Sequence, residues 1–353
     1  MTGTLTARAR LALLSLALVA AAVGASAPAA GAGITEAPCF GAASRDPARP
    51  CQNPDLRRVV VPSPAEARSV PPADCRVAYR SRILFVCGWG DEPAQAGRTV
   101  ALIGDSHAAH WRPAIEAVIR HRGWRAVSMS RAGCPLTEAY AKLPTVARSN
   151  SCRRWNRAVR AWLGRHPEVS VVFVAQHRIK VVPRRGLGQN ATVTAGYRQA
   201  WESLLARNVK RVIVLRETPR DTPGTLACVA GAMAAGRPAG PACAVPRRYA
   251  LPPDPAVAAA RGMRSARVQV ADFTNVFCSA RLCLPVIGGA LVHRDTEHMN
   301  RQFVASLGPL MVAKVDRLAA SWRDPSRKAD AFQQDGGAPK PLGIIHPPGR
   351  PAT

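Results

Sequence analysis

A serine, a histidine and an aspartate that lie far apart in the sequence could together carry out acyl transfer. The serine is Ser106, in the tetrapeptide Gly104-Asp105-Ser106-His107, which directly follows an apolar run. A serine between a strand tip and a helix can be exposed, and the positive helix end next to it favours developing negative charge. Serine is also a favoured helix cap. The tetrapeptide alone therefore leaves a nucleophile and a helix cap equally open.

The segment Asp295-Thr296-Glu297-His298 contains the base that such a serine needs. A serine hydroxyl is a poor nucleophile until a base removes its proton, and histidine titrates close to neutral pH. A carboxylate three residues earlier can bind the other imidazole nitrogen and hold its tautomer and orientation. By itself, the segment is more typical of a charged surface loop. Together with a serine at a strand end, it predicts Ser106 as nucleophile, His298 as general base and Asp295 as the orienting carboxylate.

Short apolar runs alternate with helical patterns between residues 98 and 322, and these elements must position the three residues. Strands are predicted at 99–103, 126–129, 169–175, 212–215 and 268–271, and helices at 111–121, 155–163, 192–206 and 300–320. A long Pro-, Gly- and Cys-rich insertion is expected at 216–255. Strands separated by helices favour a parallel sheet with both faces covered, an α/β fold. Ligands of such sheets bind at the carboxyl ends of the strands, which is where Ser106 is expected.

Composition divides the chain into four parts. Residues 1–32 have a positively charged start, an apolar stretch of thirteen residues and a small-residue cleavage site after Ala32, which is typical of a signal peptide. An uncleaved N-terminal anchor is the alternative. Residues 33–95 are a Cys- and Pro-rich extension, 96–323 form the predicted α/β domain, and 324–353 are predicted to be a disordered tail. The mature protein is therefore expected to be secreted or extracytoplasmic.

The ten cysteines fall along the sequence as five neighbouring couples. An even number in an exported chain favours disulfides, although spacing does not prove their connectivity. The simplest scheme pairs Cys39 with Cys51, Cys75 with Cys87, Cys134 with Cys152, Cys228 with Cys243, and Cys278 with Cys283. No CxxC or Cys/His spacing of a zinc site occurs, so we predict neither a metal nor a cofactor.

The chain is strongly basic, with 49 Lys and Arg against 22 Asp and Glu, a formal net charge of +27. The charge is dispersed, and neither a zinc-finger spacing nor an RNP-type aromatic motif is present. We therefore do not expect a nucleic-acid partner. A basic surface would suit an anionic wall polymer.

The residues around the serine and the histidine resemble a known family. VALIGDSHAAHW at 100–111, together with RDTEH at 294–298, is similar to SGNH (GDSL-like) hydrolase domains. The closer resemblance is to the extracytoplasmic SGNH domain that follows the membrane acyltransferase-3 domain in polysaccharide O-acetylases. That group carries a Cys-Pro after the second strand, as in Gly-Cys-Pro at 133–135. It also carries a cysteine pair before the Asp-x-x-His loop, as at 278 and 283.

The resemblance covers about residues 70–322 and implies a fold and a set of roles. The fold is flavodoxin-like, three α/β/α layers around a central parallel sheet of about five strands, here stapled by disulfides. Position by position, Ser106 matches the acyl-accepting nucleophile, His298 the general base and Asp295 its orienting carboxylate.

The resemblance also implies donors for the oxyanion of a tetrahedral intermediate. The backbone N–H groups of Ser106 and Gly133 match two such donors. The third donor of the family is usually an asparagine after the third strand, and no asparagine stands there. Gln176 could donate through its amide instead, or His177 through a ring N–H.

Five further residues have weaker interpretations. Asp105 is expected to stabilise the turn before Ser106 rather than to react. His107 either lines the pocket or holds the loop. Glu217 belongs either to the pocket rim or to a plain turn, and the plain turn is the preferred interpretation. His293 is the best substitute for His298 as base. Arg294 binds an anionic substrate group or is simply solvated, the preferred alternative.

Three functions are compatible with these observations. The first is an acyl-ester enzyme that works through an acyl-serine on O-acetyl groups of cell-envelope polysaccharide. Water as acceptor makes it an esterase; a sugar hydroxyl makes it an O-acyltransferase, with a separate membrane acyltransferase-3 protein as possible partner. The second is a non-catalytic glycan-binding module, suggested by the missing asparagine. A lipase comes last because aromatic residues make up only 5% of the chain.

Overall fold

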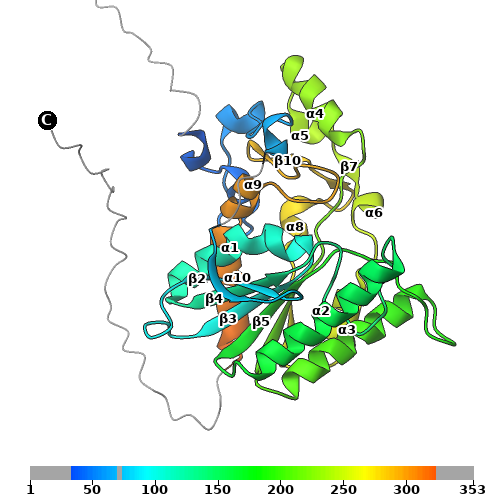
Figure 1. The fold of residues 1–353 in the computed structure, drawn as a ribbon. Coiled ribbons are helices and arrows are strands. Elements are labelled where there is room, and N and C mark those ends of the chain that lie inside the picture. The colour runs from blue at the N-terminus through cyan, green and yellow to red at the C-terminus, as the bar shows by residue number, and fades with distance from the viewer. Residues whose placement is uncertain (1–32, 70–73, 323–353) are drawn as a thin grey trace, which may run out of the picture.

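The computed structural model describes residues 33–69 and 74–322 of the chain (Figure 1). Within these two ranges, none of the helices combines the length and the apolar character that a membrane span requires. The signal peptide predicted at 1–32 and the disordered tail predicted at 324–353 lie outside the described residues, so both stay predictions.

Seven strands form the central sheet, in the spatial order β1-β2-β4-β3-β5-β6-β8. Their bounds are β1 Arg76–Arg80, β2 Phe85–Gly90, β3 Thr99–Gly104, β4 Arg125–Ser130, β5 Val169–Ala175, β6 Arg211–Leu215 and β8 Val268–Ala271. The strands β4, β3, β5, β6 and β8 pair in parallel, which confirms the predicted parallel sheet. The central strand of the seven is β3, the strand that leads to Ser106.

The sheet is larger than the five strands predicted, because residues before position 96 add β1 and β2 to its edge. β2 is antiparallel to β4, and β1 is antiparallel to β2. All five residues of β1 are exposed, so neither face of this strand is buried in the way that an apolar pattern in a sequence indicates. Two strands of the Cys- and Pro-rich extension thus belong to the same sheet as the domain that follows it.

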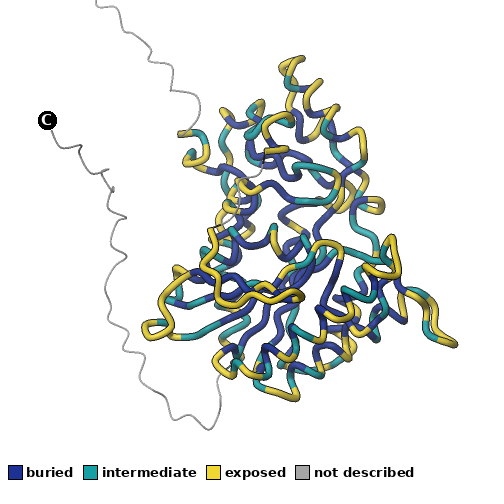
Figure 2. Tube along the Cα trace, viewed as in Figure 1, coloured by how far each residue is buried: buried dark blue, intermediate teal, exposed yellow. Residues whose placement is uncertain are grey.

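Both faces of the sheet are buried, as expected for parallel strands (Figure 2). Successive side chains of a strand point to opposite faces. In β3, Val100 and Leu102 contribute to one hydrophobic cluster, and Ala101 and Ile103 contribute to the other. Because a helix layer packs on each face of the sheet, the inner strands need apolar side chains on both faces, which gives them continuous apolar runs.

Helices cover each face. The first cluster takes in α1 Ser106–Arg122, α8 Thr274–Phe277, α9 Arg301–Ser306 and α10 Gly308–Ala320. The second takes in α2 Val146–Gly164, α3 Gln189–Leu205 and α7 Pro255–Gly262. The single helix predicted at 300–320 is wrong: two helices meet at Leu307. Pro309 follows in the first turn of α10, and because proline has no N–H, it cannot continue the hydrogen bonds of α9.

A small lobe packs beside the sheet and joins segments that are far apart in the sequence (Figure 1). Its elements are η1 Ile34–Glu36, η2 Gly41–Arg45, η3 Pro54–Arg57, η4 Glu66–Arg68, α4 Thr225–Ala234, α5 Ala239–Ala242, β7 Val245–Pro246, α6 Arg247–Ala250, β9 Leu282–Cys283, β10 Val286–Ile287 and β11 Ala290–Leu291. Val60 and Ala67 pack there with Val229, Val286 and Leu291 in a hydrophobic cluster of their own. The insertion expected at 216–255 is thus a folded part of this lobe, and Figure 1 shows it next to the N-terminal segment.

All ten cysteines are paired as the simplest scheme predicts. The disulfides join Cys39 to Cys51, Cys75 to Cys87, Cys134 to Cys152, Cys228 to Cys243, and Cys278 to Cys283. Each closes a short loop, which restricts the unfolded chain and stabilises the fold by about 2–4 kcal/mol where the bond is unstrained.

Candidate active site

Ser106 is the first residue of α1, directly beyond the end of the central strand β3. The turn before it needs Gly104, because φ there is +156° and a Cβ would lie 1.8 Å from the carbonyl oxygen of Ala175. Asp105, and not Ser106, caps the helix: its Oδ1 accepts the backbone N–H of His107 at 2.9 Å. Ser106 is therefore not the helix cap, which was the alternative to its role as nucleophile.

Asp105 also ties the serine turn to the next strand. Its Oδ2 accepts the backbone N–H of His177, beyond β5, at 2.8 Å. The carboxylate is completely buried, and burial raises its pKa, an effect that nearby His107 and the two backbone N–H donors oppose. Asp105 thus stabilises the turn, as expected, and holds the ends of β3 and β5 together.

The three residues predicted to react together do meet in the structure. The ring nitrogen Nε2 of His298 lies 2.9 Å from Oγ of Ser106, although 192 positions separate the two residues. The other ring nitrogen, Nδ1, lies 2.8 Å from Oδ2 of Asp295. With Nδ1–H donating to the carboxylate, Nε2 is left as an acceptor for the serine O–H group. The arrangement is that of a nucleophile, a base and a group that orients the base.

A short turn holds the base and the carboxylate in register. Oδ1 of Asp295 accepts the backbone N–H groups of Glu297 at 2.9 Å and of His298 at 2.7 Å. Next to the base, the backbone N–H of Met299 donates to Nδ1 of His110, a half-buried residue of α1. The imidazole is therefore fixed both by its own turn and by the helix that carries the serine.

The hydrogen bonds of this pair shift the pKa of both partners toward their charged forms. The hydrogen bond with Asp295 raises the pKa of His298 above its ordinary value of 6.5, and it outweighs the opposing effect of burial. Burial by itself would raise the pKa of Asp295, but hydrogen bonds from the His298 ring and two backbone N–H groups lower it overall. The aspartate is thus ionised at neutral pH, ready to stabilise an imidazolium.

Gly133, the predicted oxyanion donor, lies in a turn after β4 at the same edge of the sheet. Its φ is +66°, and the N–H of Cys134 donates to the carbonyl of Arg131 across the turn. A glycine suits the third position of such a turn because a side chain would be strained there. Nothing within 4 Å would meet a Cβ at Gly133, so the turn borders open space.

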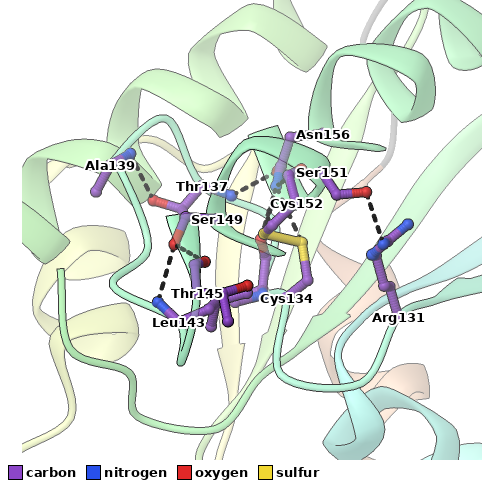
Figure 3. The surroundings of a disulfide bond; sticks show 11 residues. Arg131, Cys134, Thr137, Ala139, Leu143, Thr145, Ser149, Ser151, Cys152 and Asn156 are labelled. Atoms are coloured by element: carbon purple, nitrogen blue, oxygen red, sulfur yellow. Dashed lines mark hydrogen bonds between the residues drawn. A yellow bond between two sulfur atoms is a disulfide. The ribbon is translucent and has the colours of Figure 1, made fainter. Parts of the chain in front are cut away.

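The disulfide between Cys134 and Cys152 anchors the Gly133 turn to α2 (Figure 3). Asn156 of α2 strengthens the anchor, because its Nδ2 donates to the carbonyl of Pro135 at 3.0 Å and its Oδ1 accepts the N–H of Thr137 at 2.8 Å. The covalent bond and the buried amide together hold the chain next to Gly133 in place.

The two candidates for a third oxyanion donor differ in what they already contact. His177 has its ring Nε2 3.2 Å from Oε2 of Glu297, and its backbone N–H is taken by Asp105. Gln176 is buried, and neither its amide nitrogen nor its amide oxygen has a hydrogen-bond partner among the described residues. An unpaired buried amide is costly, so Gln176 has the donor that a ligand would satisfy.

Glu217 is a residue that the sequence analysis misjudged as part of a plain turn. It lies two residues beyond the end of β6, and its Oε1 is 2.7 Å from Nδ1 of His107, the neighbour of Ser106. Its Oε2 lies 4.0 Å from Nδ1 of His177. The signal was its place after a parallel strand, where site residues gather; its burial could not be seen in the sequence.

Burial makes Glu217 and His107 titrate in opposite directions. It raises the pKa of Glu217 well above the ordinary value, with His177 opposing. It lowers the pKa of His107 to about 4, with Asp105 opposing. Both shifts favour the uncharged forms of the two groups, and the imidazole of His107 is therefore neutral at neutral pH.

The expected substitute base, His293, contacts a different carboxylate. Its Nδ1 lies 3.1 Å from Oδ2 of Asp221, and both side chains are buried. The backbone N–H of Asp221 donates to the carbonyl of Thr296, next to Asp295. The structure thus contains a second His–Asp pair beside the loop of the first, and the sequence analysis did not single out Asp221.

Two overlapping groups of side chains are spaced so that they could hold a metal ion. In each group, one ligand atom per residue lies within 4.8 Å of the others: His107, Glu297 and His298 in one, and His107, His177 and Glu217 in the other. The predicted absence of a metal and of a cofactor stays a prediction.

The features above define a three-layer α/β protein with a Ser–His–Asp group at the carboxyl edge of its sheet. The family model described as "SGNH domain (fused to AT3 domains)" matches residues 67–313. The chain therefore belongs to this family of SGNH domains, which confirms the resemblance drawn from its motifs. The match begins before the boundary expected at residue 96 and takes in both edge strands, β1 and β2.

One solved structure that resembles the chain is the periplasmic domain of a lipopolysaccharide acetyltransferase from Salmonella ser. Paratyphi A. The two are 14% identical, with a TM-score of 0.47, over 63% of this chain and 84% of that chain. No curated protein matches the chain.

Proposed function

We propose that the protein is a serine-dependent acyl-ester hydrolase or O-acyltransferase that acts on O-acetyl groups of cell-envelope polysaccharide. The observation that carries the proposal is the 2.9 Å contact between Nε2 of His298 and Oγ of Ser106, with Asp295 on the other ring nitrogen. Membership of a family of SGNH domains that are fused to AT3 domains supports acyl groups as the substrate class.

The first half of the reaction transfers the acyl group to the serine. His298 Nε2 takes the hydroxyl proton of Ser106 as Oγ bonds to the ester carbonyl carbon, and the carbonyl oxygen becomes an oxyanion. When this tetrahedral intermediate collapses, the bond to the sugar oxygen breaks and that oxygen takes the proton from His298. The products are a free sugar hydroxyl and an acyl-serine.

The second half releases the acyl group by the same route in reverse. An acceptor O–H gives its proton to His298 and its oxygen bonds to the acyl carbon; the bond to Oγ then breaks and Ser106 recovers the proton. Water as acceptor releases acetate, and a sugar hydroxyl forms a new ester. For transfer, a separate membrane acyltransferase-3 protein would supply the acyl groups outside the cytoplasm.

The oxyanion of both intermediates would be stabilised by N–H groups at this edge of the sheet. The backbone N–H of Ser106 stands at the N-terminus of α1, and that of Gly133 belongs to a turn that borders open space. The unpartnered amide of Gln176 would be the third donor in place of the family's asparagine. Each donor aimed at the developing charge lowers the barrier by about 3–4 kcal/mol.

A chromogenic ester tests the proposal directly. The purified protein should cleave p-nitrophenyl acetate, a fluorophosphonate probe should label Ser106, and Ser106→Ala should abolish both. Ser170→Ala is a matched control, since Ser170 lies at the start of β5, at the far edge of the sheet. A folded protein that neither cleaves the ester nor takes up the probe would instead be a non-catalytic glycan-binding module.

A further inference from the structure

An open cavity of about 430 Å³ adjoins the candidate active site on the side of Asp295. Besides Asp295, six residues line it: Arg68, Thr222, Pro223, Leu226, Arg294 and Thr296. They come from three segments, namely the end of η4, residues 222–226 at the entry to α4, and residues 294–296. The sequence suggested nothing about Arg68, and the reaction described above uses none of these six side chains.

Packing and hydrogen bonds hold the walls of the cavity. Ala67, which precedes Arg68, is buried in the hydrophobic cluster of the small lobe together with Val229 of α4. Leu226 packs against the same cluster. The N–H of Asp221, at the entry to α4, donates to the carbonyl of Thr296 at 2.8 Å, which ties α4 to the Asp295–His298 turn. The cavity is therefore a built feature of the junction between the small lobe and the sheet.

Two guanidinium groups face a single carboxylate in this cavity, and that carboxylate is engaged elsewhere. Among the described residues, Arg68 is exposed and has neither an ion pair nor a hydrogen-bond partner. Nε of Arg294 lies 3.9 Å from Oδ2 of Asp295, but the same oxygen is 2.8 Å from the His298 ring. The cavity thus has an excess of positive charge and unused N–H donors.

These donors suit an oxyanion on a sugar. A guanidinium group presents a planar fork of N–H donors that matches the two oxygens of a carboxylate or a phosphate. Thr222 and Thr296 add hydroxyl groups, and Pro223 and Leu226 add an apolar wall against which the C–H face of a sugar ring can pack. A volume of this size falls in the usual range of small-ligand sites and accommodates one sugar unit with its charged group.

We propose that this cavity binds an anionic sugar unit, carrying a carboxylate or a phosphate, next to the sugar whose ester reacts at Ser106. The proposal rests on the proposed function for the reaction at Ser106, and it adds that the polysaccharide is acidic. Arg68 and Arg294 bind the anion, and the cavity's contact with Asp295 places the neighbouring sugar beside the reacting group.

Binding measured without catalysis tests the cavity separately from the enzyme. The Ser106→Ala protein is titrated, by chemical-shift changes at low salt, with three ligands built on one ring: methyl galactoside, methyl galacturonoside and methyl galactoside 6-phosphate. We expect the two anions to bind at least about tenfold more tightly than the neutral sugar, since each adds charge-assisted hydrogen bonds. The anion that binds more tightly distinguishes a carboxylate from a phosphate.

Variants of Arg68 connect the binding to this cavity. Arg68→Gln should weaken binding of the preferred anion by about fivefold or more and leave the neutral sugar unaffected, while Arg68→Lys should lie between, because lysine keeps the charge but not the fork. Arg165→Gln removes the same charge from the C-cap of α2, far from the cavity, and should not change the preference. Equal affinity for all three ligands, or equal effects of Arg68→Gln and Arg165→Gln, overturns the proposal.

The two proposals fail in different ways. If p-nitrophenyl acetate is not cleaved but the anions bind through Arg68, the enzyme proposal is wrong and the anion site stands. If the ester is cleaved but the anions show no preference, the anion site is wrong and the enzyme stands. With acetylated substrates, Arg68→Gln should lower kcat/KM for the anionic sugar more than for its neutral counterpart.

Discussion

Two His–Asp pairs lie side by side in this protein and show how similar groups come to serve different ends. In the first, His298 Nδ1 is 2.8 Å from Asp295; in the second, His293 Nδ1 is 3.1 Å from Asp221. The side chains of His298 and Asp295 are 19% and 46% exposed, against 2% and 6% for His293 and Asp221. The chemistry of the pairing is the same, whereas access to solvent and substrate is not.

The second nitrogen of each imidazole decides what the pair can do. Nε2 of His298 faces the hydroxyl of Ser106, whereas Nε2 of His293 is buried and has no hydrogen-bond partner among the described residues. A base acts only on a proton within hydrogen-bond reach. We infer that the Asp295 pair is catalytic and that the Asp221 pair holds the small lobe against the Asp295–His298 turn.

The largest contrast is expected from removing each imidazole in turn. His298→Ala should lower kcat for p-nitrophenyl acetate by about 10⁴-fold or more, since loss of one member of such a triad disables the whole group. His293→Ala should keep activity within about tenfold and lower the free energy of unfolding by about 2–4 kcal/mol, as expected when a buried side chain is truncated. Activity and urea unfolding are measured on both variants. Similar losses of activity in the two would contradict the division of roles.

Substitutions of the two aspartates should also affect different properties, activity for Asp295 and stability for Asp221, but with smaller effects than those of the histidines. Asp295→Asn should reduce kcat by about 10³- to 10⁴-fold, because an amide can hold His298 in the wrong tautomer. Asp221→Asn should cost about 1–3 kcal/mol of stability, because a buried hydrogen-bond partner of His293 is altered. Steady-state rates and thermal unfolding distinguish them, and an active Asp295→Asn would remove Asp295 from the mechanism.

The pH at which two neighbouring imidazoles titrate would sharpen the contrast between exposed and buried histidines. His298, whose pKa is raised by Asp295, should titrate above pH 6.5, and His107, whose pKa burial lowers, should titrate near pH 4. Because the reaction needs neutral His298, activity should rise with pH through the higher midpoint. NMR of the ring nitrogens measures both, with Asp295→Asn expected to move the His298 midpoint down. If activity instead rises with pH through a midpoint near pH 4, the general base is a group other than His298.

The smallest effect is expected at Glu217, whose carboxyl group is only 11% exposed and contacts His107. Burial raises the pKa of Glu217 well above its ordinary value, which favours the uncharged acid, so Glu217→Gln should change the free energy of unfolding by less than about 1 kcal/mol. Glu217→Ala, which leaves a cavity, should cost about 1–3 kcal/mol. Urea denaturation compares the two. A glutamine that destabilises as much as alanine would mean that Glu217 is charged in the folded protein.

Much of the fold followed from local pattern, and the errors arose where local pattern is weak. The five parallel strands were predicted because each contains a short, mainly apolar run of the kind that two helix layers bury. β1 was missed because its side chains are exposed, and its place in the sheet depends on pairing with β2. The break at Leu307 was missed because an apolar helical pattern continues across it while the backbone ladder does not.

In the candidate site, too, the residues with a local sequence signal were predicted and the others were not. Ser106, His298 and Asp295 could be proposed because each carries a local signal, a strand-end turn in one case and a spacing of three residues in the other. Glu217 and Asp221 could not be ranked, since a carboxyl group after a strand is ordinary until it is known to be buried against a histidine.

By itself, the sequence determined the types of element, the neighbouring couples of cysteines and the residues able to react, because these depend on contacts within a few positions or on side-chain chemistry. Only the tertiary structure decided which histidine contacts the serine 192 positions away and which carboxyl groups are buried away from solvent. It also decided that Arg68 lines a cavity beside Asp295. Burial and long-range proximity arise from many packed segments at once, and no single stretch of sequence contains that information.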